Sequence, residues 1–466
     1  MVGGLSGPRM LVALAIAIVV LVVLVLKTKI HAFLALIIAA SLVGVIGGMP
    51  ITDTVLENGT TLGIINSIKN GFGGTLGSVG IIIGFGVMMG QIFEISGAAQ
   101  RMAHTFLGLF GKKREEEAMA ITGFLVSIPI FCDSGFMVLA PIAKAISKAT
   151  KKSVISIGVA LAAGLVITHS LVPPTPGPLG VCGIFGIDVG KFILIAIVLA
   201  LPMAVACIAY ARHLGKKYYV VPNENDEMVR SEPKAATYDE SFSMNTSEMP
   251  STLLSFLPLA VPIVLILIAT ITNAVGATDG FMKVFQFIGN PIIAVGLGLV
   301  IAILTLGRCA DRHTCLLEME KGMMSAGIIM LLTGGGGALG QVIKDSGLGN
   351  YMAEGIAATA IPVVVLPLII STAMRFIQGS GTVAMTTAAS ISAPIVIAAG
   401  ANPFLGAIAC CVGSLFFGYF NDSYFWVVNR TLGISEAKEQ IEIWSLTSTV
   451  AWAIGVVEVL VLNIFF

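Results

Sequence analysis

The sequence predicts an all-α polytopic membrane protein made of two inverted repeats, each with five spans and one re-entrant hairpin. The first observation behind this prediction is composition: of 466 residues, 56% are hydrophobic and 11% are charged, and the mean hydropathy is +0.97. A soluble domain is typically about 25% charged. The second observation is a series of long apolar runs, and the third is a set of matching segments in the two halves of the chain.

Composition also excludes several classes of protein. The 26 basic and 26 acidic residues cancel, so no basic excess points to nucleic acid. The seven cysteines form no C-x-x-C pair and lie mostly in apolar runs, which indicates buried thiols. No metal, haem or nucleotide motif is present, and the glycines of 333–338 lack the Lys-Ser/Thr of a phosphate-binding loop. We therefore expect no metal, no cofactor and no enzymatic activity.

Ten apolar runs are close to the roughly 20 residues that a helix needs to cross a bilayer core. They lie near residues 10–26, 30–48, 76–96, 153–171, 191–211, 252–275, 288–307, 323–343, 403–420 and 444–464. The first run is too long for a cleaved signal, so we expect it to be retained. Two further apolar regions, 117–150 and 361–400, are interrupted by proline, glycine and polar residues. We expect each of these two regions to form a hairpin.

Basic residues predict the orientation of these segments, because cytoplasmic loops accumulate Lys and Arg. If Lys27 is inside, successive spans also place the basic clusters at 101–114 and 144–152 inside. The hairpin at 117–150 then enters and leaves from the cytoplasm, whereas the hairpin at 361–400 enters and leaves from outside. Both termini are expected outside, in a bacterial inner membrane.

The two halves of the chain share short matches in the same order. They are Gly90–Gly97 with Gly340–Gly347, Asp133–Gly135 with Gly379–Gly381, and His169–Leu171 with Gly413–Leu415. The offset is nearly constant, which indicates a duplication; the alternative is a chance recurrence of Gly and Ser. We predict a first repeat at 1–213 and a second, inverted repeat at 251–466, a plan common in transporters. Between them, 214–250 is polar and without apolar period, and is expected to be a flexible cytoplasmic linker.

The first interruption, 128–135, contains Pro129, Asp133, Ser134 and Gly135, of which Ser134 and Gly135 are candidate substrate ligands. Proline lacks a backbone N–H and glycine admits unusual dihedral angles, so a turn is expected. A carboxylate at membrane depth is costly without a partner, which makes Asp133 a candidate for ion coupling. The alternative is that Asp133 caps the helix that follows.

The second interruption, 168–178, has four prolines that cannot continue a helix. The break exposes a new helix N-terminus, which favours an anion. His169 is a candidate proton carrier because histidine changes charge near neutral pH; the alternative is a hydrogen-bonded structural histidine. Ser170 and Thr175 are candidate hydroxyl ligands, and for Thr175 a role in the turn is the alternative.

The third interruption, 375–382, contains Arg375, whose planar fork suits a carboxylate and whose charge does not switch off. The small residues after it allow backbone N–H groups to converge on an anion. The alternatives are that Arg375 extends to the outer interface or pairs structurally with an aspartate. The candidate substrate ligands here are Arg375, Gln378, Gly379, Ser380, Gly381 and Thr382.

The fourth interruption follows the run 403–420, where Asn421, Asp422 and Ser423 are expected in the middle of a span. They predict a second helix break with polar ligands: Asn421 and Ser423 for the substrate, and Asp422 for the coupling ion. Alternatively, the aromatic residues after them mark the membrane interface, where Asp422 would then lie.

Together these motifs resemble the signatures of the gluconate:proton symporters of the GntP family. The resemblance rests on residues 131–136, 169–178, 378–383 and 421–426, in this order, and covers essentially the whole chain. It implies an ion-transporter fold of inverted repeats, a proton as coupling ion, and a homodimer with a scaffold part and a mobile transport part. Two positions depart from the pattern of gluconate-transporting members. Asp133-Ser134-Gly135 stands for Glu-Val-Gly, and Thr175 stands for a histidine.

The sequence therefore predicts a secondary active transporter that imports small hydroxylated organic anions by proton symport. Gluconate-like sugar acids are the expected substrates, and the two departures point to shorter hydroxy acids such as glycerate. The alternatives are a symporter of D-serine or another amino acid, a sodium-coupled carboxylate transporter and, further away, an anion channel. The expected partners are the substrate, the proton or sodium, and the lipid bilayer, with no nucleic acid.

Overall fold

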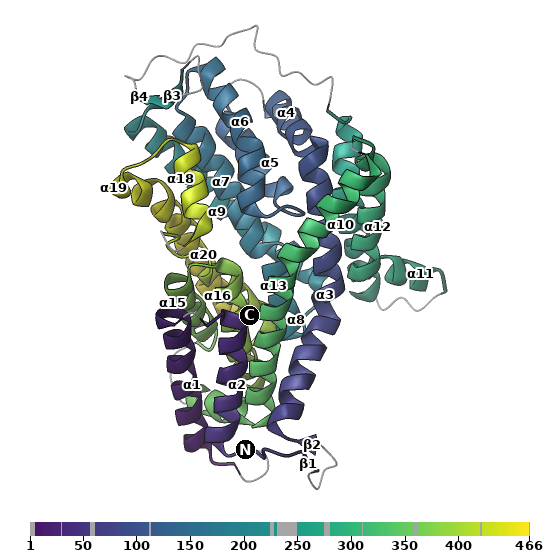
Figure 1. Cartoon of the computed structure of the whole chain (residues 1–466), viewed down its shortest axis with the longest axis vertical. Coiled ribbons are helices and arrows are strands. Elements are labelled where there is room, and N and C mark those ends of the chain that lie inside the picture. The colour runs from purple at the N-terminus through teal and green to yellow at the C-terminus, as the bar shows by residue number, and fades with distance from the viewer. Residues whose placement is uncertain are drawn as a thin grey trace.

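The computed structural model describes residues 5–28, 30–55, 61–110, 113–223, 228–230, 249–274, 280–309, 311–357, 362–419 and 422–465. Helices dominate it, as the composition predicts. They form an elongated molecule in which α1 begins near one end and strands β3 and β4 lie near the other (Figure 1).

The first half contains nine helices and a short antiparallel strand pair among its described residues. They are α1 (Gly7–Lys27), α2 (Ala32–Gly47), β1 (Thr54–Val55), β2 (Thr61–Leu62), α3 (Ile64–Ser96), α4 (Ala98–Phe110), α5 (Glu115–Val126), α6 (Cys132–Thr150), α7 (Val154–Leu171), α8 (Pro176–Phe185) and α9 (Val189–Lys217). A second strand pair, β3 (Val220–Pro222) and β4 (Met228–Arg230), follows α9.

The described part of the second half is helical. It comprises α10 (Thr252–Ala274), α11 (Gly280–Ile288), α12 (Pro291–Thr305), α13 (Arg312–Asp345), α14 (Leu348–Ala357), α15 (Val365–Gln378), α16 (Gly381–Ala398), α17 (Pro403–Gly413), α18 (Ser423–Thr431), α19 (Ala437–Gln440) and α20 (Leu446–Phe465). A 3₁₀ turn spans Gly307–Cys309, and a π-helical turn at Ile441–Ser445 joins α19 to α20.

Helices of the same kind follow one another in both halves. The 33-residue α3 and the 34-residue α13 pack along each other. Each precedes a shorter helix, a helix–turn–helix pair (α5–α6 and α15–α16) and two helices separated by a break (α7–α8 and α17–α18). The α5–α6 pair lies in the upper half of Figure 1, and the α15–α16 pair lies in the lower half. Both regions expected as hairpins are therefore pairs of helices, at different levels of the molecule.

All ten expected spans coincide with helices, but fewer reach full length. The described residues include six helices long and apolar enough to cross a membrane, or eight when two bent pairs are counted. α2, α17 and the segment Gly7–Leu21 of α1 are shorter apolar helices. α16, which we expected only as an arm of a hairpin, is among the six. Ten full-length spans is thus an overestimate by this measure, because several apolar runs end early at turns and breaks.

The helix break predicted after the run 403–420, at the fourth interruption, begins earlier in the structure than the sequence predicts. The apolar run 403–420 is helical only to Gly413, and turns follow from Ser414 to Phe417. The reason is close packing at Gly418, where a Cβ atom would lie 2.8 Å from the Arg375 guanidinium and 2.9 Å from the Asp422 carboxylate. Ser448 accepts the backbone N–H of Gly418 at 2.9 Å, and Ser445 donates to its carbonyl at 2.7 Å. The chain unwinds here because its backbone must pass directly beside two charged groups.

The beginning of the expected linker is ordered in the structure. α9 continues to Lys217, and β3 pairs with β4. Arg230 of β4 binds Glu439 of α19, with Nη1 donating to Oε1 at 2.9 Å, and Lys217 forms an ion pair with Glu442. The first described part of the expected linker 214–250 therefore has regular structure, whereas residues 224–227 and 231–248 lie outside the described residues.

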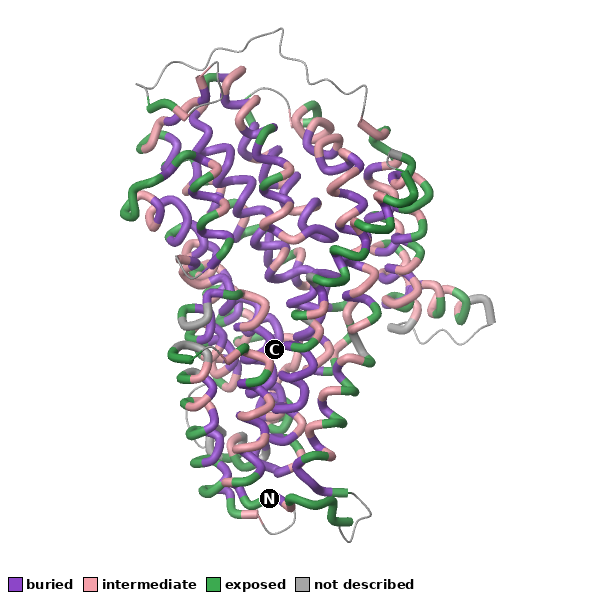
Figure 2. Tube along the Cα trace, viewed as in Figure 1, coloured by how far each residue is buried: buried purple, intermediate pink, exposed green. Residues whose placement is uncertain are grey.

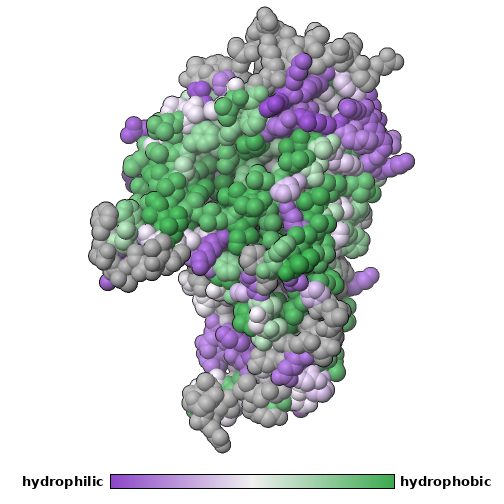
Figure 3. Space-filling model, turned by 180° about the vertical axis from the view of Figure 1, so that it is seen from behind, coloured by the Kyte–Doolittle hydropathy of each residue, from purple (hydrophilic) through white to green (hydrophobic). Residues whose placement is uncertain are grey.

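Burial separates the interior helices from those that face lipid. Nearly every residue of α7 is buried, and most residues of α16 are buried too (Figure 2). α9, α10 and α20 instead expose long rows of large apolar side chains, among them Val198, Ile271 and Val461. Seen from behind, the molecule carries a broad hydrophobic area, with hydrophilic side chains gathered toward one end (Figure 3). Such a surface is expected to contact lipid, because it is far larger than the apolar patches of soluble monomers.

Candidate functional site

The four interrupted segments meet around one cavity of about 470 Å³. α6 and α18 begin at its wall, α7 ends there, and the turn between α15 and α16 completes it. Ten residues predicted for the site line it: Asp133, His169, Ser170, Arg375, Gly379, Ser380, Gly381, Thr382, Asp422 and Ser423. The interruptions are therefore parts of one site.

Arg375 and Asp422 form a buried ion pair in this cavity. Their side chains are 5% and 9% exposed, and Nη2 of Arg375 donates to Oδ2 of Asp422 at 2.5 Å. Nη1 of Arg375 donates to the carbonyl of Gly379, and Nε is buried with no hydrogen-bond partner in the described part of the chain. Burial excludes the alternative in which Arg375 extends to the interface. Arg375 has an aspartate partner, Asp422, and its role in substrate binding stays a prediction.

Asp133 faces the second half of the chain. Ser423 Oγ donates to its carboxylate at 3.1 Å, and Cys132 Sγ lies 3.8 Å from the other carboxylate oxygen. The N-cap residue of α6 is Phe131, so the alternative in which Asp133 caps this helix is wrong. Asp133 lies instead in the first turn of α6, where the positive end of the helix dipole favours a carboxylate.

Four helices begin at the cavity wall. α2 starts at Ala32, α6 at Cys132, α16 at Gly381 and α18 at Ser423. Ser380 caps α16 by accepting the N–H of Val383 at 3.4 Å, and Asp422 caps α18 by accepting the N–H of Tyr424 at 3.2 Å. Each N-terminus carries a partial positive charge from its unpaired N–H groups, so their convergence favours an anion in the cavity.

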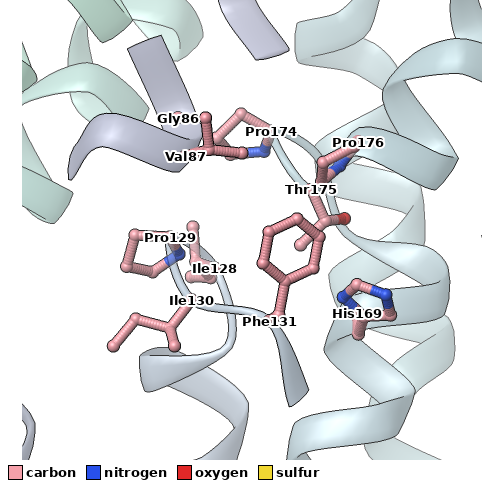
Figure 4. A pocket seen from close by; sticks show the side chains of 10 residues that line it. All are labelled: Gly86, Val87, Ile128, Pro129, Ile130, Phe131, His169, Pro174, Thr175 and Pro176. Carbon is pink, nitrogen blue, oxygen red and sulfur yellow. The ribbon is translucent and has the colours of Figure 1, made fainter. Parts of the chain in front are cut away.

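A second, much smaller cavity of about 10 Å³ lies between the α5–α6 turn, the α7–α8 break and α3. Figure 4 shows His169 and Thr175 on one side of it, Pro129 and Ile130 on the other, and Phe131 between them. The ring of His169 lies against Phe131, with centroids 5.7 Å apart, and its Nδ1 is buried without a described partner. His169 and Phe131 line both cavities.

Three predicted site residues lie away from the large cavity. Thr175 lines the small one and donates to the carbonyl of Val172 at 2.6 Å, so it serves the turn. Ser134 and Gly135 are not part of the large cavity's wall; a Cβ at Gly135 would lie 2.8 Å from Leu165 of α7, which makes it a packing position. The side chain of Gln378 and all of Asn421 lie outside the described residues.

Sequence reasoning missed several residues of the cavity wall. Cys132, Ser414 and Tyr424 adjoin predicted motifs, and the match of Ser414 with Ser170 between the two halves is a signal that could have identified it. His31, the N-cap residue of α2, also lines the cavity, and nothing in its sequence context marks it. Tyr424 donates its hydroxyl to the carbonyl of Ala162 at 3.2 Å, which ties α18 to the middle of α7.

Comparison with known proteins now decides the family. A model of the GntP family permeases matches residues 9–465. The chain belongs to the GntP permease family. This permease is 49% identical to an uncharacterized permease of Haemophilus influenzae, over 94% of this chain and 89% of the relative. It is 33% identical to the high-affinity gluconate transporter of Escherichia coli, over 97% and 99%, and 30% identical to the L-idonate transporter of the Gnt-II system of Escherichia coli, over 93% and 94%.

Two solved structures share the fold of the permease. MtrF of Neisseria gonorrhoeae aligns with a TM-score of 0.63 at 14% identity, over 94% of this chain and 96% of that one. The YdaH transporter of Alcanivorax borkumensis aligns with a TM-score of 0.62 at 14% identity, over 92% and 95%. The family assignment confirms the predictions of a multi-pass inner-membrane protein that transports its ligand and is not an enzyme.

Proposed function

We propose that this permease imports small hydroxylated organic anions, either gluconate-like sugar acids or shorter hydroxy acids such as glycerate, by proton symport. One observation carries the proposal: a buried arginine, Arg375, lines a cavity with polar side chains at which four helix N-termini converge. The names of the relatives, gluconate and L-idonate transporters, support the same class of substrate.

The carboxylate of the substrate is held by Arg375 and by the N–H groups at the start of α16. A guanidinium binds a carboxylate through two parallel hydrogen bonds, which fixes its orientation as well as its position. Gly381 begins α16 beside Arg375, and a Cβ placed there would lie 3.9 Å from Nη1. A substrate carboxylate at this point therefore meets the side chain and the helix terminus together.

Hydroxyl groups of the substrate are met by short polar side chains from several elements of the cavity wall. Ser170 comes from α7, Ser380 and Thr382 from the α15–α16 turn, and Ser423 from α18. Hydroxyls both donate and accept, so this set suits a polyhydroxy chain better than an apolar acid. In this proposal, Gln378 and Asn421 complete the set.

Charge balance favours a proton as the coupling ion. Arg375 is the one guanidinium among the described lining residues, and it faces two carboxylates, Asp133 and Asp422. A further anion adds negative charge to a buried site unless one of these groups is neutralised. Asp133, Asp422 and His169 are the candidates for carrying the proton, because each lines the cavity and can change charge.

We extend the proposal to the whole molecule. The shared order of helices supports two inverted repeats at 1–213 and 251–466, with 214–250 on the cytoplasmic side and the helix–turn–helix pairs as re-entrant hairpins. Interrupted helices at a central site are typical of transporters with this plan. We propose a homodimer in which the parts carrying the hairpins move against a scaffold.

Uptake into proteoliposomes tests the function. The purified permease is reconstituted, and labelled gluconate, L-idonate, glycerate and D-serine are supplied under an imposed pH gradient or sodium gradient. We expect saturable accumulation of hydroxylated acids that follows the pH gradient. Accumulation that follows only the sodium gradient would identify sodium as the coupling ion. Flux that neither saturates nor accumulates substrate against its gradient would indicate a channel.

One observation favours a second candidate substrate. The described contacts of Asp133 are with a hydroxyl and a thiol, so its carboxylate has no cationic partner among the described side chains. A zwitterion such as D-serine would place its ammonium near Asp133 and its carboxylate at Arg375. Uptake of D-serine, with no uptake of the hydroxy acids in the same vesicles, would select this candidate.

A further inference from the structure

The guanidinium proposed to hold the substrate already holds a carboxylate of the chain itself. Nη2 of Arg375 donates a hydrogen bond to the carboxylate of Asp422 at 2.5 Å, and Nη1 donates to the carbonyl of Gly379. Nε is buried and without a hydrogen-bond partner in the described part of the chain, and each Nη atom keeps a second N–H. Each edge of the guanidinium that can bind a carboxylate through two parallel hydrogen bonds includes an Nη atom, so the contacts with Asp422 and Gly379 compete with a second carboxylate for this geometry.

The surroundings of Asp422 decide what happens when it is displaced. The other described hydrogen bond of its side chain is with the N–H of Tyr424. The other titratable and charged groups that line the cavity are Arg375 from α15, Asp133 and Cys132 from α6, His169 from α7, His31 at the start of α2, and Tyr424 from its own helix. Asp133 adds negative charge on this side, and Arg375 is the one permanent cation among the described lining residues. Without Arg375, an ionised Asp422 would be a buried charge with no counter-ion, which is strongly unfavourable.

We propose that Asp422 occupies the anion site of the empty permease and that substrate and proton enter by exchange. The carboxylate of the substrate replaces Asp422 on Arg375, and a proton from solution binds the freed carboxylate of Asp422. The charge then balances: one negative charge arrives with the substrate and one positive charge arrives with the proton. The inference rests on the proposed function and specifies its coupling residue, with one proton for each substrate carboxylate.

The same segment connects the exchange to both helix–turn–helix pairs. Asp422 contacts α15 through its ion pair with Arg375. Ser423 contacts α6 by donating to Asp133 at 3.1 Å. Tyr424 contacts α7 by donating to the carbonyl of Ala162 at 3.2 Å. Movement of Asp422 away from Arg375 therefore acts on three contacts, and two of them, those of Ser423 and Tyr424, bridge the two halves of the chain. Occupancy of the anion site can in this way alter the packing of the elements that must move.

The test is the variant Asp422→Asn, in which the side-chain oxygen still accepts the N–H of Tyr424 but cannot take up a proton. In the native permease, substrate affinity should fall as the pH rises, approaching about tenfold per pH unit once Asp422 must be protonated for binding. In Asp422→Asn, affinity should stay within about twofold over the same range and be at least as high as the best native value. Exchange of labelled for unlabelled substrate should persist, while accumulation driven by a pH gradient is lost.

Two matched variants complete the experiment. Asp422→Glu keeps a carboxylate and should keep pH-driven accumulation. Asp133→Asn leaves the Arg375–Asp422 pair intact. It should keep the pH dependence of substrate affinity, independently of any change in its transport rate. Thermal unfolding with and without substrate controls for folding. Asp422→Asn leaves Arg375 unpaired, so substrate should raise its unfolding temperature more than it raises that of the native protein.

The outcomes separate this inference from the proposed function. Folded Asp422→Asn that still accumulates substrate with the pH gradient, keeps a pH-dependent affinity, or binds no substrate at any pH would overturn the exchange. Native permease that takes up none of the acids in response to a pH gradient would instead overturn the proposed function.

Discussion

At the scale of single residues, Arg375 shows how a membrane protein keeps a permanent charge at a buried position. An uncompensated guanidinium in the interior is strongly unfavourable, so it needs an anion at all times. Asp422 supplies that anion in the structure. Removing either partner alone therefore changes stability as well as binding, and experiments on this pair must measure both.

Substitution of Arg375 tests the carboxylate anchor. A charge-assisted hydrogen bond contributes about 1.5–3 kcal/mol, so Arg375→Gln should lower substrate affinity by about tenfold to a hundredfold. Arg375→Lys keeps the charge without the fork and should recover part of the loss. Affinity and folded protein are measured on the same preparation.

Two further variants control this experiment. Arg375→Gln combined with Asp422→Asn removes both charges and should restore folding but not affinity. Arg430→Gln removes an exposed arginine that stacks on Trp426 away from the cavity and should leave affinity unchanged. Normal substrate affinity in well-folded Arg375→Gln would show that Arg375 does not bind the substrate carboxylate.

At the scale of elements, the turn of the first helix–turn–helix pair lies directly on α3. A Cβ added at Gly90 would lie 2.2 Å from the carbonyl oxygen of Pro129, so only glycine allows this contact. The sequence singled out Gly90 as part of a repeat match, but not as the support of the turn. The position of Asp133 near the cavity depends on this contact, because the turn leads directly into α6.

Gly90→Ala tests the contact. We expect it to lower stability by about 1–3 kcal/mol, as overpacking does, and to reduce substrate affinity because the turn is pushed away from α3. Gly84→Ala is the matched control on the same helix, since nothing lies within 4 Å of a Cβ at that position. Thermal unfolding and substrate binding are measured for both. Equal effects of the two variants would contradict the assigned contact.

The base of the same helix–turn–helix pair is held by charges. Lys152, between α6 and α7, pairs with Glu115 at 2.7 Å and Glu116 at 2.9 Å. Burial lowers the pKa of Lys152, but its contacts with the two carboxylates outweigh burial and raise the pKa above its ordinary value. A raised lysine pKa adds stability that is fully present below about pH 10.4 and is lost as the pH rises through the folded-state value.

Lys152→Gln should therefore destabilise the protein at neutral pH, by about 2 kcal/mol, because two buried carboxylates lose their partner. The difference from the native protein should stay constant between about pH 7 and 9 and shrink above about pH 10.4. Lys151→Gln, which changes a neighbouring exposed lysine, is the control. A difference that grows with rising pH would contradict the assigned direction of the shift.

At the scale of the whole molecule, the distribution of basic residues predicts two faces. Lys69 lies near the start of α3 and Lys216 near the end of α9, and both are exposed. The strands next to them, β1–β2 and β3–β4, lie at opposite ends of the molecule (Figure 1). The inverted-repeat proposal places Lys69 outside and Lys216 in the cytoplasm.

Cysteine labelling in cells tests this orientation. Lys216→Cys should react with a membrane-impermeant reagent only after the cells are opened, and Lys69→Cys should react in intact cells. The six native cysteines whose side chains the structure describes are buried, so the unmodified permease measures the background. Labelling of both positions from the same side would contradict the predicted topology.

The sequence by itself determined the helical membrane class, the positions of the apolar segments and of their interruptions, and the family. These properties are local: hydropathy, proline and glycine act on the segment in which they stand. Tertiary structure alone decided which polar residues share a cavity. It pairs Arg375 with Asp422 across 47 positions and Ser423 with Asp133 across 290, and it turns Gly135 toward α7. Helical periodicity fixes the face of each residue only relative to its own helix, whereas partners depend on how helices pack, and close backbone contacts such as those at Gly90 and Gly418 set that packing.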